Sequence, residues 1–229
     1  YVSGELWGLS AIRAPEAWDA ATGSMDVYVA VADSGIYAAH EDLQPNLDTR
    51  LSRNFARAEG AAANPSDYID VHRHGTHVAG TVLGSGMSDP LARGMASKAK
   101  AWTWNFSSSS DEVQEWQEME RCHQEDGITL TQNSYGLPLG QMCLFYRQFS
   151  YNTLGRDIQM DELVNKYPSL LPVYACGNDG AGCADSVLAH YGEKQYGTIP
   201  NRAKNSFFVG ACDLIGRLGA FSSCGPLDD

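Results

Sequence analysis

The chain has few basic residues. It carries 16 Lys and Arg against 28 Asp and Glu among 229 residues, which gives a formal net charge of −12 at pH 7. Nucleic acids and anionic membranes are themselves negative, so this balance disfavours both as partners unless the few cations gather in one patch. The sequence contains no such basic patch, and we expect no nucleic-acid partner.

Long apolar runs are also absent. No stretch approaches the roughly 20 residues of a membrane-spanning helix, so no membrane partner is expected. The first residues, Tyr1 to Gly4, lack an initiator Met and the charged and apolar regions of a signal peptide. The N-terminus is therefore expected to be a processed or trimmed end.

The cysteines follow none of the usual zinc-site spacings. The six are Cys122, Cys143, Cys176, Cys183, Cys212 and Cys224. Disulfides formed in an oxidising compartment are the expected use, which favours a secreted or extracellular protein. At least one bridge is expected among the last four, and a separate bridge from Cys122 to Cys143 is left open. The alternative is a set of buried reduced thiols, which an intracellular protein tolerates.

What the chain does have is the composition of a globular protein. With 43% hydrophobic and 10% aromatic residues, 229 residues can bury a core as one domain, so residues 1–229 are treated as a single unit. Short apolar segments alternate with amphipathic ones. The expected helices are 15–21, 74–83, 111–125 and 156–167, and the expected strands are 26–32, 99–106, 128–132, 171–175 and 206–211. This alternation predicts an α/β fold, a doubly wound parallel sheet with helices on both faces.

Two short segments suggest chemistry. An apolar strand ends in Asp33, and about forty residues later His74 opens a helix of small residues. A buried carboxylate can orient an imidazole as a general base, although an Asp-Ser-Gly string alone is most often a turn. Gly75, Ala79 and Gly80 are expected to permit close helix packing, and His77 is expected to matter mainly for that packing. A metal site of His72, His74 and His77 is a weaker alternative, because no carboxylate is suitably placed.

Five strings in one order carry a family resemblance. They are Asp33-Ser34-Gly35, His74-Gly75-Thr76-His77-Val78-Ala79-Gly80, Asn133-Ser134-Tyr135-Gly136, Ala175-Cys176-Gly177-Asn178 and Phe221-Ser222-Ser223-Cys224-Gly225-Pro226. From about Trp7 to its last residue the chain resembles the subtilisin-like serine proteases, or subtilases. The resemblance implies a subtilisin-like fold and hydrolysis of polypeptides through an acyl-enzyme.

The resemblance also implies roles for individual residues. Asp33 and His74 would be catalytic and Asn178 would donate its amide to the oxyanion. Gly177 would let the backbone turn beside the cleft. The substrate-binding residues would be Ser134, Tyr135, Gly136, Ala175 and Gly177, with an extended substrate between the 134–136 strand and residues 104–109.

The family's nucleophile motif is missing from this sequence. No Gly-Thr-Ser string occurs in it, and Ser222 and Ser223 belong to a different family motif. The expectation is that residues 1–229 are the N-terminal portion of a subtilase catalytic domain, severed after Asp229 by processing or nicking and inactive alone, with a second chain carrying the catalytic Ser. A propeptide or protein inhibitor is a further expected partner. The alternative is a pseudoprotease that binds or regulates without chemistry.

No cofactor is expected for the chemistry, and no catalytic metal. Residues 82–94 lack the Asn-rich loop with which some subtilases hold calcium, and Asp42 alone is weak support for such a site. The resemblance therefore leaves a structural calcium ion possible, but the sequence does not locate its ligands.

Overall fold

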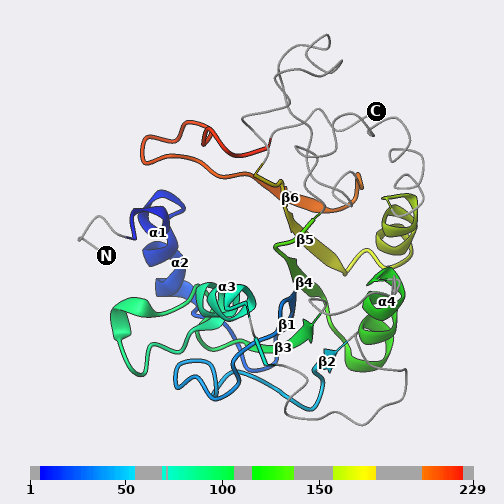
Figure 1. The fold of residues 1–229 in the computed structure, drawn as a ribbon, viewed down its shortest axis with the longest axis horizontal. Coiled ribbons are helices and arrows are strands. Elements are labelled where there is room, and N and C mark those ends of the chain that lie inside the picture. The colour runs from blue at the N-terminus through cyan, green and yellow to red at the C-terminus, as the bar shows by residue number, and fades with distance from the viewer. Residues whose placement is uncertain are drawn as a thin grey trace. The chain divides into compact units, whose positions relative to one another are not determined.

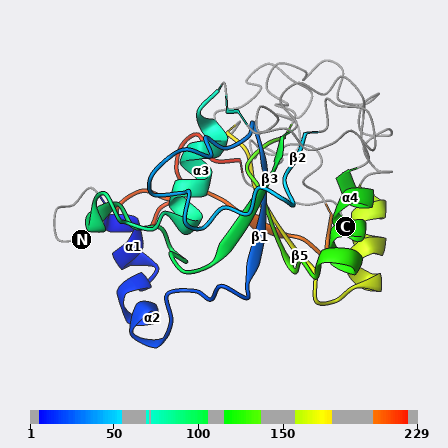
Figure 2. The same ribbon diagram turned by 90° about the horizontal axis from the view of Figure 1, so that it is seen from below.

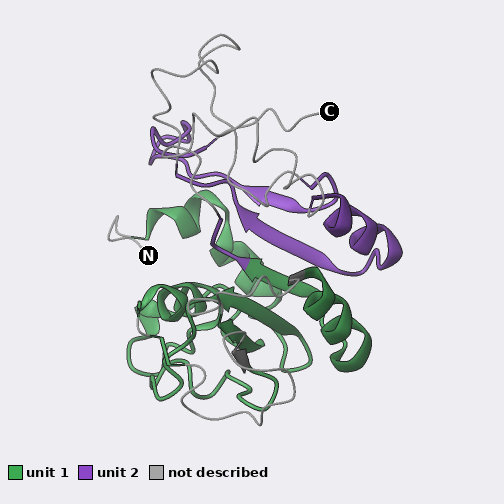
Figure 3. Ribbon diagram, turned by 45° about the vertical axis from the view of Figure 1, so that its right-hand side comes forward, with its two compact units in different colours: residues 1–132 green, residues 133–229 purple. Residues whose placement is uncertain are grey.

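The computed structural model describes residues 6–54, 69–70, 72–105, 115–136, 157–178 and 203–223. The chain forms two compact units, residues 1–132 and residues 133–229 (Figure 3). The residues singled out from the sequence are divided between these units.

The first unit contains a sheet with the strand order β2-β3-β1-β4. Its strands are β1 (Tyr28–Asp33), β2 (Arg53–Asn54), β3 (Lys100–Asn105) and β4 (Leu130–Asn133), the last ending at the unit boundary. β3 pairs in parallel with both β1 and β2, and Asp33 lies in register with Asn105. All residues of β1 after Tyr28 are buried. A continuous buried apolar run is typical of a parallel strand covered on both faces.

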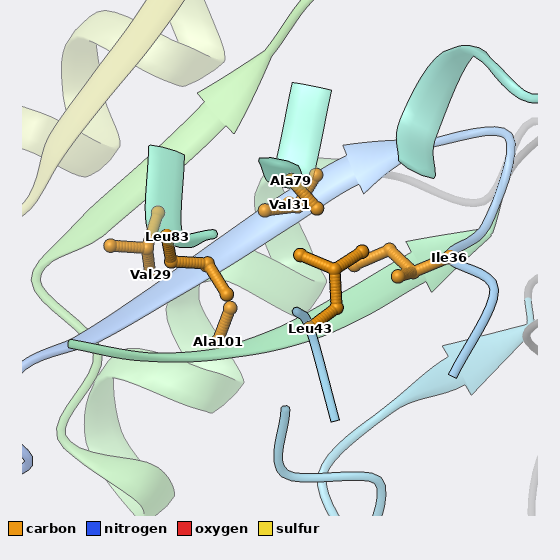
Figure 4. Close-up of a cluster of buried hydrophobic side chains, with 7 residues drawn as sticks. All are labelled: Val29, Val31, Ile36, Leu43, Ala79, Leu83 and Ala101. Atoms are coloured by element: carbon orange, nitrogen blue, oxygen red, sulfur yellow. The ribbon is translucent and has the colours of Figure 1, made fainter. Parts of the chain in front are cut away.

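Helix α3 (His74–Leu83) covers one face of this sheet. Its buried residues Gly75, Ala79 and Leu83 recur every four positions and form one stripe. Figure 4 shows the core that results, in which α3 and β1 contribute most of the buried side chains. The cluster comprises Val29, Val31, Ile36, Leu43, Ala79, Leu83 and Ala101. The helix predicted over residues 74–83 is confirmed.

Helix α4 (Glu115–Asp126) lies on the opposite side of the sheet from α3 (Figure 2). Met119 and Cys122 are buried, and the Thr131 hydroxyl of β4 donates to Met119 Sδ at 3.9 Å. The first unit therefore has helices on both faces of its sheet. Two helices near the N-terminus, α1 (Trp7–Ala11) and α2 (Ala14–Ala20), precede β1 (Figure 1).

In the second unit, β5 (Leu171–Ala175) pairs in parallel with β6 (Phe207–Val209). Residues 157–166 are helical and bury Met160 and Leu163. Tyr174 of β5 is buried and stacks on Phe208 with the ring centroids 6.0 Å apart. These elements match the predicted helix and strands to within a few residues.

Among the described residues, three short elements were not predicted: α1, β2 and a 3-10 turn, η2 (Pro90–Ala92). Each lacks the periodic apolar pattern on which the predictions rest. Residues 111–114 of the third predicted helix lie outside the described residues. Within the part of the chain that the structure describes, no helix has the length and apolar character needed to cross a membrane.

Candidate active site

Asp33 is the last residue of β1, at the carboxyl end of a central strand. β3 adjoins β1 on one side and β4 adjoins it on the other. In open α/β sheets, ligands bind outside the carboxyl ends of the strands where the chain switches sides. The sheet therefore places Asp33 where a functional site is expected.

Asp33 and His74 form a hydrogen-bonded pair. His74 Nδ1 lies 2.8 Å from Asp33 Oδ1 and 2.9 Å from Oδ2. The Ser34 amide also donates to Asp33 Oδ1, at 2.7 Å, which further fixes the carboxylate. The Asp33 side chain is 4% exposed, whereas that of His74 is 57% exposed. A buried acceptor thus orients a ring whose remaining edge faces outward.

Close contact between α3 and the segment after β1 makes this pair possible. A Cβ at position 75 would lie 2.1 Å from the Gly35 carbonyl oxygen and 3.1 Å from Asp33 Cβ. Gly75 is therefore required where it stands, as the sequence predicted. The same expectation for Gly80 is wrong, because a Cβ there would meet nothing within 4 Å. Gly80 lies about 140° around the helix from Gly75 and faces away from the contact.

Asp70 is a site-associated residue that the sequence analysis missed. Its half-buried carboxylate accepts hydrogen bonds from Ser34, His72, Arg73 and Thr76. Burial by itself would raise the pKa of Asp70, but these hydrogen bonds, led by Thr76, outweigh it and hold the pKa below its usual value. An Asp just before a helix is a capping and turn signal, so Asp70 could have been found by reading back from His74.

The other two histidines of this region do not join the pair. His72 and His77 are exposed. The expectation that His77 supports helix packing is wrong, since it lies about 200° around α3 from Gly75 and away from the sheet. Among the residues that the structure describes, no three His, Cys, Asp or Glu side chains are grouped so that they could hold a metal ion.

The proposed oxyanion residues belong to the second unit. Ala175 ends β5, and the exposed Asn178 follows it by three residues. Gly177 has φ +100°, in the left-handed region that favours glycine. The Cys176 amide donates to the Val209 carbonyl at 2.9 Å, and the Ser223 amide donates to the Gly177 carbonyl at 3.0 Å. The turn that presents Asn178 is therefore held at two points.

Residues 134–136 follow β4 without forming a strand of their own, and all three are half-buried. The Tyr135 hydroxyl lies 3.5 Å from Asn133 Oδ1, and its ring meets that of Tyr174 edge-on at 6.3 Å. Of the other segment predicted to bind substrate, residues 104–109, Trp104 and Asn105 lie within the described residues and 106–109 do not.

Ser222 and Ser223 are 2% and 1% exposed. The Ser222 hydroxyl accepts from the Ala211 amide at 2.9 Å and donates to the Ser223 carbonyl at 3.2 Å. These side chains pack inside the second unit, which agrees with the motif assignment that kept them from the nucleophile role.

Three of the six cysteines can be placed. Cys122, Cys176 and Cys212 are reduced in the structure. Burial, above all, raises the pKa of the Cys122 thiol. Because these three cysteines are free, the Cys122 to Cys143 bridge that the sequence left open is not formed, and neither is any bridge to Cys176 or Cys212. Cys183 and Cys224 lie outside the described residues, so a bridge between these two stays a prediction.

Comparison with known protein families decides the assignment. The model of the subtilase family matches residues 24–229. The chain belongs to the subtilase family. The resemblance noted from the five strings is therefore confirmed.

Individual relatives are distant. Subtilisin E of Bacillus subtilis is 26% identical over 233 residues, covering 98% of this chain and 51% of subtilisin E. The major intracellular serine protease of Bacillus subtilis is 34% identical over 93 residues, covering 40% of this chain and 27% of that protease. This subtilase chain thus spans about half the length of subtilisin E.

A solved structure shows the same fold. The epidermin leader peptide processing serine protease of Staphylococcus aureus superimposes with a TM-score of 0.64 at 21% identity, covering 91% of this chain and 52% of that one. The predicted fold class, a subtilisin-like α/β sheet with helices, is confirmed.

Proposed function

We propose that this subtilase chain supplies the acid–base half of a serine endopeptidase. The observation that carries the proposal is the pair formed by the buried Asp33 carboxylate and the exposed His74 imidazole, joined through Nδ1. Because Asp33 occupies Nδ1, Nε2 is the nitrogen available to a nucleophile.

The proposed chemistry follows from that geometry. Nε2 of His74 takes the proton of a serine hydroxyl while the serine oxygen forms a bond to the scissile carbonyl carbon. The resulting imidazolium is stabilised by Asp33 and returns its proton to the leaving amine as the C–N bond breaks. In the second half, Nε2 takes a proton from water as the water oxygen attacks the acyl-enzyme, and the proton then returns to the serine.

Asn178 is the proposed oxyanion donor. Its exposed position at the end of β5 and the turn held at Gly177 support this role. The side-chain amide would donate to the developing oxyanion, a contribution known in subtilisin to change turnover by about 10²–10³-fold. A polypeptide substrate would lie extended along Ser134, Tyr135 and Gly136, and Ala175 would line the same cleft.

The nucleophile is proposed to lie in polypeptide outside these 229 residues. The sequence holds no Gly-Thr-Ser string, and Ser222 and Ser223 are buried. Residues 1–229 alone are then expected to be inactive, and denaturing mass spectrometry of active material should reveal the serine on additional sequence or on a second chain. Full activity from residues 1–229 alone would refute this part of the proposal.

Cofactors, further partners and location stay predictions. The proposed chemistry requires no cofactor, and a structural calcium ion has no assigned ligands. A propeptide or protein inhibitor would occupy the substrate cleft. Secretion is proposed from the cysteine content, but one relative is an intracellular protease, so family membership does not decide the compartment.

The decisive experiment replaces His74 in the active protease that contains this chain. His74→Ala should abolish cleavage of fluorescently labelled casein, because it removes the imidazole proposed to take the serine proton. His77→Ala is the matched control: it removes an exposed imidazole from the same helix and should leave cleavage within about two-fold. Full activity of His74→Ala would refute the proposal.

A further inference from the structure

We propose that Asp70 is a positioning residue for the Asp33–His74 pair. The inference rests on the function proposed above for that pair. Asp70 would act through the backbone and hydroxyl groups on either side of the pair, without contacting the substrate.

The contacts of Asp70 divide between its two carboxylate oxygens. Oδ1 accepts from the Ser34 hydroxyl at 2.8 Å, the Arg73 amide at 2.7 Å and the His72 amide at 3.0 Å. Oδ2 accepts from the Thr76 amide at 2.8 Å and the Thr76 hydroxyl at 2.7 Å. Every one of these partners is a donor, so the site requires an acceptor at both oxygens.

These partners adjoin both members of the pair. Ser34 follows Asp33 directly, and its hydroxyl also accepts from the Gly75 amide at 3.0 Å. Arg73 precedes His74 directly, and Thr76 lies two residues after it. The Thr76 hydroxyl further accepts from the Tyr37 amide at 2.9 Å. One carboxylate thus joins the end of β1 to the start of α3.

The backbone at the start of α3 needs such support. Arg73 has φ 64° and ψ −1°, a left-handed conformation that is unfavourable for a residue with a side chain. Strained conformations of this kind persist where surrounding contacts determine them. The hydrogen bond from the Arg73 amide to Asp70 is such a contact, and it lies one residue from the catalytic imidazole.

Asp70 is ionised at neutral pH, since its pKa lies below the usual carboxyl value. Asparagine has nearly the same shape but presents an NH₂ group in place of one oxygen. That group would face either the Thr76 donors or the donors from Ser34 and Arg73. Asp70→Asn should therefore loosen the link between Ser34 and α3 with little change in volume.

The test compares Asp70→Asn with Asp42→Asn in the active protease. Asp42 is also a hydrogen-bonded aspartate, but its serine partners lie beyond the other end of α3. With a fluorescence-quenched peptide substrate, Asp70→Asn should lower kcat about 10- to 100-fold at nearly constant KM, because small displacements of a catalytic group are costly. Asp42→Asn should keep kcat within about two-fold while losing comparable stability.

A second readout does not depend on turnover. The Nδ1 proton of His74, hydrogen-bonded to Asp33, should give a downfield NMR resonance that shifts or broadens in Asp70→Asn and is unchanged in Asp42→Asn. Unchanged kcat and an unchanged resonance in folded Asp70→Asn would overturn the proposal. So would an equal loss of kcat in Asp42→Asn, because it would show that general destabilisation is sufficient.

Two further variants keep the outcomes distinguishable. If Asp70→Asn does not fold, Ser34→Ala is used instead, because it removes only the hydroxyl that links Asp70 to the Gly75 amide. An unaltered resonance and an unaltered kcat in that variant would overturn the proposal. If His74→Ala remains active, the proposed function fails. The resonance comparison then decides the role of Asp70 alone.

Discussion

Two aspartates secure the two ends of helix α3 with similar chemistry. At the N-terminal end, Asp70 accepts from hydroxyl and amide groups of Ser34, Thr76 and the helix start. Beyond the C-terminal end, Asp42 accepts from the Ser85 hydroxyl at 3.1 Å, the Ser88 amide at 3.0 Å and the Ser88 hydroxyl. In both places a carboxylate holds the segment next to one end of the helix.

What differs is the set of residues next to the hydrogen-bond donors. The donors to Asp70 adjoin Asp33 and His74, whereas the donors to Asp42 lie in the loop after the helix. The same kind of interaction should therefore set catalytic geometry at one end and only stability at the other. Asp42, which the sequence suggested as a weak candidate for calcium, accepts hydrogen bonds from Ser85 and Ser88.

The largest expected effect tests whether the N-terminal end of α3 is the sensitive one. Gly75→Ala places a Cβ against the Gly35 carbonyl, a contact that backbone movement must relieve. We expect a loss of about 1–3 kcal/mol in the free energy of unfolding, together with a marked fall in kcat. Urea unfolding and peptide cleavage measure both quantities.

Gly80→Ala is the matched control on the same helix. Its Cβ enters open space, and alanine is favoured over glycine in a helix by about 1 kcal/mol. It should be neutral or stabilising, with unchanged kcat. Equal destabilisation by the two substitutions would show that the contact at position 75 is not specific.

The sequence predicted the pair but not its support. Asp33 and His74 stand out because each sits beside a strong local pattern, a buried strand and a helix of small residues. Asp70 stands before the periodic segment that identified His74, and its partner Ser34 becomes a neighbour only when β1 and α3 pack together. Gly80 and His77 were assigned to packing from composition alone, and the angular position around α3 decided otherwise. To predict which face of α3 is buried, one must recognise the stripe formed by Gly75, Ala79 and Leu83.

The second prediction concerns the C-terminal end. Asp42→Asn leaves at least one serine donor without an acceptor, and hydrogen bonds to a charged group contribute about 1.5–3 kcal/mol. We expect the free energy of unfolding to fall by about 1–3 kcal/mol, with earlier proteolytic nicking in the loop of residues 84–94. Limited proteolysis with a second protease locates the opening. Retained stability would mean that the Ser85 and Ser88 contacts contribute nothing measurable.

Acid unfolding compares the two carboxylates directly. The Ser88 hydroxyl, foremost, lowers the pKa of Asp42, and hydrogen bonds lower that of Asp70 despite its burial. A native pKa below the unfolded value gives stability that is present above the ordinary value of 3.8 and lost as pH falls through the native pKa. Each group contributes at most about 1.4 kcal/mol per pH unit in that interval.

The measurement is urea unfolding at a series of pH values from neutral to below 3.8. Asp42→Asn and Asp70→Asn should each lose less stability than the parent protein on acidification. The pKa of Asp48 is also lowered, mainly by Arg50, so Asp48 contributes to acid unfolding in the same direction. The relevant quantity is therefore the difference in the free energy of unfolding between each variant and the parent. Parallel curves for parent and variants would contradict the assignment of both carboxylates.

The smallest expected effect is the most specific for Asp70. Arg73 and Arg13 are both left-handed residues at the N-cap of a helix, with φ 64° and 59°. Replacing either with Gly removes the strain of the side chain, partly offset by greater freedom in the unfolded chain, so each should change stability by no more than about 1 kcal/mol. Only Arg73, however, donates its amide to Asp70.

In a double-mutant cycle, Arg73→Gly should recover about 0.5–1 kcal/mol more in the Asp70→Asn background than in the parent, because glycine no longer needs the carboxylate to hold that conformation. Arg13→Gly should add the same amount in both backgrounds. Equal coupling for the two arginines, or none for Arg73, would mean that Asp70 does not act through the backbone that leads into His74.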